Sequence, residues 1–79
     1  MQWPAVKEVQ SNLRMLRQQR QEVRKVICML VVEQGQLRDE GFATDHERVQ
    51  YVLGRLLRFE CRLHSLCYDI ENWELYLPY

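Results

Sequence analysis

The segment E-G-F-A-T-D-H-E at residues 40–47 decides the fold, because a long helical pattern of apolar residues lies on either side of it. Gly41 can adopt the left-handed conformation that commonly ends a helix. Thr44 and Glu47 have the spacing of a capping box, which commonly begins the next helix. The expected elements are a helix over about residues 5–39, a turn over residues 40–44 and a second helix over about residues 45–76.

Apolar residues recur at alternating steps of three and four on both sides of this turn, which is the heptad pattern of helices that pack along their length. In the first helix the row consists of Val6, Val9, Leu13, Leu16, Val23, Ile27, Leu30 and Leu37, with Arg20 and Gln34 at its two polar positions. In the second helix it consists of Val49, Val52, Leu56, Phe59, Leu63, Leu66, Ile70, Trp73 and Leu77. We call these two rows the seam.

A connection this short forces the helices to run antiparallel. The predicted fold is therefore all-α, an antiparallel two-helix hairpin that forms a single domain over residues 1–79 and packs into a larger helical assembly. Pro4 suits the first turn of the first helix, and Pro78 suits the end of the second. Gly35 and Gly54 fall inside helices, where glycine costs about 1 kcal/mol relative to alanine unless another backbone approaches closely. We therefore expect tight packing near the turn.

Both helices carry more apolar residues than one seam requires. The first helix is apolar on nearly every side around Ile27 and Leu30, and a helix of that kind is buried on every side. We therefore expect binding to other protein subunits, in a homo-oligomer or a hetero-oligomer. The predicted interface consists of Val31, Val32, Tyr51, Leu53, Leu57, Cys61, Tyr68, Trp73 and Tyr76.

Four arginines follow one another at helical spacing in the first helix, namely Arg14, Arg17, Arg20 and Arg24. The first interpretation is ion pairing within the hairpin, because an antiparallel arrangement brings these residues beside Glu60, Asp69, Glu71 and Glu74 of the second helix. The second is contact with phosphate groups of a nucleic acid. The chain lacks the net positive charge and the interleaved aromatic residues that favour direct nucleic-acid binding.

Five aromatic residues gather near the two ends of the chain, namely Trp3, Tyr68, Trp73, Tyr76 and Tyr79. Two interpretations remain open. The residues form an anchor for a partner, or they close the open end of the hairpin with Trp3 stacked near Trp73.

The sequence contains no pattern typical of an enzyme or a cofactor site. Cys61, His64 and Cys67 are residue types that bind metals, but on a helix their spacing of three spreads them over roughly 120°. No nucleophile with a base, no paired carboxylates in a cleft and no glycine-rich phosphate loop is present. His46 is expected to be a polar residue at the start of the second helix. We expect no catalysis, no metal, no cofactor and no small-molecule substrate.

Composition favours a soluble intracellular protein, nuclear or cytoplasmic. Eleven basic and eleven acidic residues give a net charge of zero, so no global field attracts nucleic acid or anionic lipid. The first five residues do not resemble a signal peptide, and no run approaches the ~18 apolar residues that span a membrane. The three cysteines are odd in number and lie in helical stretches, which indicates reduced thiols.

The stretch E-R-V-Q-Y-V-L-G-R-L-L-R at residues 47–58, continuing to Leu63, resembles the central helix in the helical domain of GINS replication complex subunits. The segment before the turn, residues 31–39, is similar in kind to the helix that precedes it in that family. The chain departs from the family by lacking the small β-rich domain that its members usually carry. The matching packing positions are Arg48, Tyr51, Val52, Leu53, Leu57 and Arg58.

The resemblance implies a non-catalytic scaffold subunit that assembles with three related subunits and supports the replicative helicase in DNA replication. The alternative function is a self-associating helical-hairpin regulator or adaptor that contacts nucleic acid through the arginines of the first helix.

Overall fold

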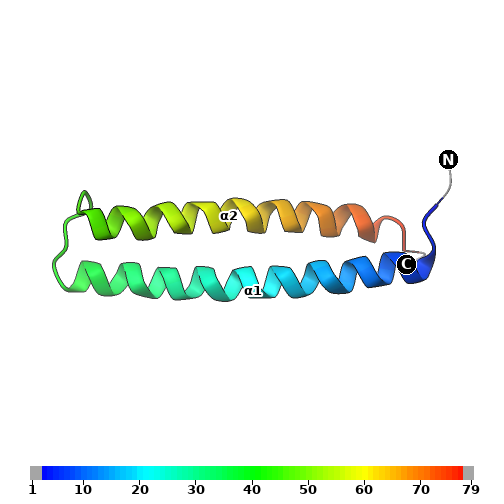
Figure 1. Ribbon diagram of the computed structural model, residues 1–79, viewed down its shortest axis with the longest axis horizontal. Coiled ribbons are helices and arrows are strands. Elements are labelled where there is room, and N and C mark those ends of the chain that lie inside the picture. The colour runs from blue at the N-terminus through cyan, green and yellow to red at the C-terminus, as the bar shows by residue number, and fades with distance from the viewer. Residues whose placement is uncertain (1–2, 78–79) are drawn as a thin grey trace.

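The computed structural model describes residues 3–77, which form two long helices joined by a short connection (Figure 1). Helix α1 spans Val6–Asp39 and helix α2 spans Glu47–Glu74. The helices lie side by side and antiparallel in a single layer that measures 56 × 19 × 15 Å. The prediction of an all-α antiparallel hairpin is confirmed, although α2 begins two residues later and ends two residues earlier than predicted.

The buried side chains of the described chain all belong to the seam. One core cluster lies near the turn and contains Leu30, Leu37, Val49 and Val52. A second cluster lies at the opposite end, which we call the open end, and contains Val9, Leu13 and Ile70. Val23 and Leu66 are buried between the two clusters. Because each helix has one buried row, the seam alone accounts for the pairing of the helices.

Three positions of the seam are not apolar core. Val6 is 48% exposed, so its assignment to the seam is wrong. The reason is that α2 ends at Glu74 and no helical turn lies opposite the first turn of α1. Arg20 and Gln34 are half-buried at their seam positions. Polar residues at such positions weaken the seam but help to fix its register.

The turn begins with a left-handed glycine, as predicted. Gly41 has a φ of +89°, its N–H donates to the Arg38 carbonyl, and the N–H of Phe42 donates to the Leu37 carbonyl. This pair of bonds is a Schellman motif, which satisfies carbonyl groups that the end of a helix would leave unpaired. Phe42 also packs against the core cluster that contains Leu37. The turn is therefore attached to the hairpin core.

The start of α2 differs from the prediction, because the capping residue is His46 and not Thr44. The His46 Nδ1 atom accepts a hydrogen bond of 3.1 Å from the Arg48 N–H, and the His46 ring lies edge-on to Phe42 with a centroid distance of 4.7 Å. His46 thus does for α2 what Thr44 was expected to do. The role of His46 as a polar residue at the start of the helix is confirmed.

Gly35 and Gly54 do not mark close packing inside the hairpin. A Cβ atom placed on either glycine would meet no atom within 4 Å. The expectation of tight backbone packing at these glycines is therefore wrong, because both lie outside the seam. Pro78 and Tyr79 lie outside the described residues.

Candidate functional site

One ion pair shows which residues share a face of the hairpin. The Arg17 guanidinium donates to a carboxylate oxygen of Glu74 at 3.5 Å, and both side chains are about half exposed. Arg17 directly follows the seam residue Leu16, and Glu74 directly follows the seam residue Trp73. The residue directly after each seam residue, on either helix, therefore lies on the same side of the hairpin as Arg17 and Glu74. We call this side the Arg17 face.

The charges of the Arg17 face are sorted by helix. On α1 the face carries Lys7, Arg14, Arg17, Arg24 and Arg38, and no acidic residue. On α2 it carries Glu60, Glu71 and Glu74, and no arginine or lysine. The face is therefore a basic strip beside an acidic strip, a separation that the net charge of zero conceals.

Between Arg24 and Arg38, the half of the Arg17 face nearer the turn carries apolar residues on both helices. Val31 of α1 directly follows the seam residue Leu30 and is 50% exposed. Leu57 of α2 is 62% exposed. Leu53 lies beside them but is only partly exposed, because it packs against the core cluster near the turn. With the exposed Cys28, these residues form a patch that the hairpin itself does not cover.

The predicted ion pairing of the helix 1 arginines is confirmed for Arg17 and wrong for the others. Within residues 3–77, Arg17–Glu74 is the one ion pair closer than 4 Å. Arg14 and Arg24 are exposed, while Arg20 is half-buried at a seam position and does not extend the strip. The sequence could not distinguish these cases, because spacing of three and four residues groups all four arginines together.

The opposite side, which we call the Arg48 face, has the reverse arrangement of charges. A groove there is lined by Glu33 and Gln36 of α1, by Glu40 directly after α1, and by Arg48 and Tyr51 of α2. A second hollow on this side, nearer the middle, is lined by Gln19 and Glu22 of α1 and by Arg62 of α2. On this face α1 is therefore acidic and the first half of α2 is basic.

The arginines of the Arg48 face already lie against aromatic rings of the hairpin. The Arg48 guanidinium is 5.7 Å from the centroid of Phe42. The Arg55 guanidinium is 5.8 Å from the centroid of Tyr51 and 5.9 Å from that of Phe59. These distances are in the range of cation–π attraction. Arg48 and Arg55 of this face therefore have partners within the chain.

The remaining predicted interface residues are spread over the outside of the hairpin. Val32 is 60% exposed and lines a shallow hollow on α1 with Cys28 and Met29. Tyr51, which is 65% exposed, belongs to the Arg48 face. Cys61 and Tyr68 are exposed on the outer side of α2. The structure therefore does not bring all nine predicted residues together in one surface.

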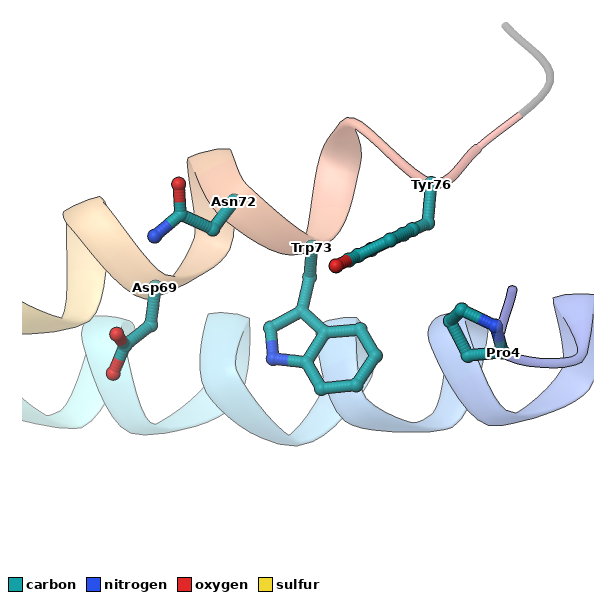
Figure 2. A pocket seen from close by; sticks show the side chains of 5 residues that line it. All are labelled: Pro4, Asp69, Asn72, Trp73 and Tyr76. Atoms are coloured by element: carbon teal, nitrogen blue, oxygen red, sulfur yellow. The ribbon is translucent and has the colours of Figure 1, made fainter. Parts of the chain in front are cut away.

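The aromatic residues at the open end are arranged around Tyr76. Its ring lies edge-on to Trp3 at 5.2 Å and tilted against Trp73 at 5.7 Å. Figure 2 shows Trp73 pointing from α2 toward α1, next to a hollow of about 440 Å³ that Pro4, Asp69 and Asn72 also line. Trp73 packs against the core, whereas Trp3 is 72% exposed. Trp3 thus pairs with Tyr76 and not with Trp73, and Tyr68 is exposed outside this group.

The described residues contain neither a metal-binding cluster nor a membrane-spanning helix. No group of three His, Cys, Asp or Glu side chains among residues 3–77 could hold a metal ion. Cys61 and His64 are exposed and Cys67 is half-buried. Neither helix, over its described residues, has a stretch long and apolar enough to cross a membrane.

Comparison with known protein families, curated proteins and solved structures gives no match to this chain. The resemblance to GINS subunits therefore stays a prediction. The two charge-sorted faces are the feature that sequence analysis missed. The signal was present in the residues directly flanking the seam, which are basic on one side of the first helix and acidic on the matching side of the second.

Proposed function

We propose that this protein is a non-catalytic assembly subunit that packs against other protein subunits through the apolar patch of the Arg17 face. The observation that carries the proposal is the exposure of large apolar side chains near the turn, with Val31 50% exposed and Leu57 62% exposed. Single exposed apolar residues are normal on any protein, but a patch shared by two helices and rimmed by charge is typical of an interface.

The small size of the hairpin supports the same proposal. A hairpin of two helices with one seam buries little apolar surface, and small domains often gain stability from a partner. A subunit that binds through one face of a preformed hairpin leaves its other face available for a further contact. This arrangement suits a scaffold.

The narrower form of the proposal is a GINS-like subunit that supports the replicative helicase in the nucleus. It rests on the resemblance of residues 47–58 to the central helix of that family. Tyr51 and Leu57 are the large hydrophobic residues in this stretch that are well exposed. Co-expression with the three other GINS subunits of the same organism tests this form. If the form is correct, the four proteins purify together as a stable complex.

The broader proposal is tested by the native mass of the full chain in cell extract and after purification. We expect a complex larger than one chain in extract, and we expect Leu57→Gln to release it. Leu75→Gln is the matched control, because Leu75 is 76% exposed and lies beyond the end of α2, away from the patch. A well-folded monomer in both extract and pure solution would exclude an assembly subunit.

One observation favours a second candidate, a hairpin regulator that contacts nucleic acid. Arg14 and Arg24 are exposed and make no ion pair closer than 4 Å within the described chain. The acidic strip of α2 on the same face opposes this candidate, because it repels phosphate groups. Binding to a duplex DNA should fall steeply as salt rises if this candidate is correct, and Arg24→Gln should lower the slope.

A further inference from the structure

We propose that the partner on the Arg17 face is a second copy of this chain, packed face to face about a two-fold axis that runs parallel to the helices. The inference rests on the proposed function and names the partner of the same surface. The product is a four-helix bundle in which α1 of each copy lies over α2 of the other. Every neighbouring pair of helices in this bundle is antiparallel, which is the common arrangement of such bundles.

The register of the hairpin fixes which residues meet. Val26 and Phe59 pack against the same core cluster and line the same hollow, so they lie at the same height along the hairpin. Arg24 therefore lies at the height of Glu60, and Val31 near that of Leu53. A two-fold axis parallel to the helices keeps every residue at its own height. Arg24 of one copy thus faces Glu60 of the other.

Charge complementarity covers the face from its middle to the open end. By the same register, Arg14 of one copy faces Glu71 of the other, because Leu13 packs beside Ile70 in the core cluster at the open end. The basic strip of α1 therefore meets the acidic strip of α2 in both halves of the dimer. Each contact occurs twice because the interface is symmetric.

The apolar patch meets itself in the same arrangement. Val31 of one copy lies near Leu53 of the other, and Cys28 lies near Leu57. These contacts remove Val31 and Leu57, which are 50% and 62% exposed in the hairpin, from water, and such burial is the main favourable term in association. Gly35 lies on this face and offers no Cβ atom, so the second copy can approach the α1 backbone there.

The size of the face is sufficient for a stable dimer. Its outline of 56 by 19 Å is about 1,000 Å², compared with about 800 Å² buried per partner in a standard interface. An axis perpendicular to the helices would use the same area but would place the apolar patch over the charged end of the other copy. Only the parallel axis matches both the apolar and the charged parts of the face.

The Arg48 face is the weaker candidate for the same partner. Its arginines Arg48 and Arg55 already lie over aromatic rings of the hairpin. Moving these cations to a second copy would give up contacts that exist, whereas Arg14 and Arg24 would gain partners.

The experiment measures the mass of the purified full chain by light scattering and sedimentation equilibrium, with helicity recorded by circular dichroism. The wild-type chain should have twice the 9.7 kDa mass of one copy at about 100 µM. Two variants then reverse one strip each. The first is Arg14→Glu with Arg24→Glu, and the second is Glu60→Arg with Glu71→Arg.

Each variant alone should be a monomer, because its dimer would place like charges opposite each other. An equimolar mixture should recover a dimer that contains one copy of each variant. In that dimer the acidic α1 of the first variant meets the basic α2 of the second, and the basic α1 of the second meets the acidic α2 of the first. Ion pairs formed inside one chain cannot produce this rescue, because mixing leaves each chain unchanged. Recovery in the mixture is therefore specific for contact between copies.

The outcomes that overturn the inference are distinct from those that overturn the proposed function. The wild-type chain could be a folded monomer when pure and yet belong to a Leu57-dependent complex in extract. This result would mean that the partner is a different protein and not a second copy. A wild-type dimer that both variants retain excludes this face as the interface. If a variant loses helicity, the mass of the wild-type chain decides. A wild-type mass equal to that of one chain excludes the inference by itself.

Discussion

The two broad faces of the hairpin have the same kinds of charge but use them differently. On the Arg48 face, Arg48 and Arg55 of α2 lie over Phe42, Tyr51 and Phe59 of the hairpin. On the Arg17 face, Arg17 has one ion pair at 3.5 Å, and the neighbouring Arg14 and Arg24 have none closer than 4 Å among the described residues. Two faces with similar charges therefore differ in how far those charges are satisfied inside the chain, and we base the choice of the Arg17 face on Arg14 and Arg24, which lie unpaired within the described chain beside the apolar patch.

The largest effect should come from breaking the seam that holds both faces in place. Val52→Asp would bury a carboxylate without a partner, because Val52 is 2% exposed, and should cost about 3 kcal/mol or more. We expect loss of most helicity in circular dichroism. Val32→Asp is the matched control, because Val32 is 60% exposed. Equal loss of helicity in both variants would contradict the separation of seam from faces.

The next largest effect should come from replacing an exposed apolar side chain, and it should differ between the two faces. Leu57→Gln on the Arg17 face should weaken the dimer about tenfold or more, since burying a leucine side chain contributes about 1.5–3 kcal/mol. Tyr51→Gln on the Arg48 face should leave the dimer unchanged, although Tyr51 is as exposed as Leu57. Sedimentation equilibrium measures both. A larger effect from Tyr51→Gln would assign the interface to the Arg48 face.

A smaller effect should follow from reversing one charge on each face. Arg24→Glu should weaken the dimer about three- to tenfold, because the contact occurs twice and each exposed pair contributes up to ~1 kcal/mol. Arg62→Glu should have little effect on association. The difference between the two variants should shrink at 0.5 M salt, where the Debye length is only about 4 Å. Light scattering at two salt concentrations checks this, and a difference that salt does not change would argue against ion pairing.

The smallest effect concerns the ion pair within the chain. Glu74→Gln removes the partner of Arg17, and both side chains are about half exposed, so the pair should contribute about 0.5 kcal/mol at most. We expect thermal unfolding to shift by no more than a few degrees for a domain of this size. Glu33→Gln on the Arg48 face is the control, because Glu33 is in no ion pair closer than 4 Å in residues 3–77. A shift above 10 °C for Glu74→Gln would mean that the pair holds the open end together.

Much of the fold could be predicted from the sequence because its signals are local. The alternating steps of three and four identified every residue of the buried core, and Gly41 identified the end of the first helix. The errors lie where the signal depends on three-dimensional context. The cap was assigned to Thr44 because the capping box is a pattern of spacing, whereas the structure uses the ring nitrogen of His46, a less common cap.

The candidate site could be predicted only in part. The excess of apolar residues correctly pointed to exposed side chains such as Val31 and Leu57. It also included Leu53 and Trp73, which pack against the hairpin's own core. Hydrophobicity alone does not say whether a residue next to the seam turns toward the partner helix or toward solvent, because that depends on how closely the two helices approach.

The sequence by itself determined that this protein consists of two long amphipathic helices joined by a turn, because helical periodicity, glycine and proline act through neighbouring residues. The tertiary structure decided which flanking residues of the two helices lie at the same height on a face, and so which charges lie close enough to pair. That choice depends on the register of α1 against α2, which is a property of the packed pair. The basic strip, the acidic strip and the apolar patch nearer the turn become one surface only when the two helices meet.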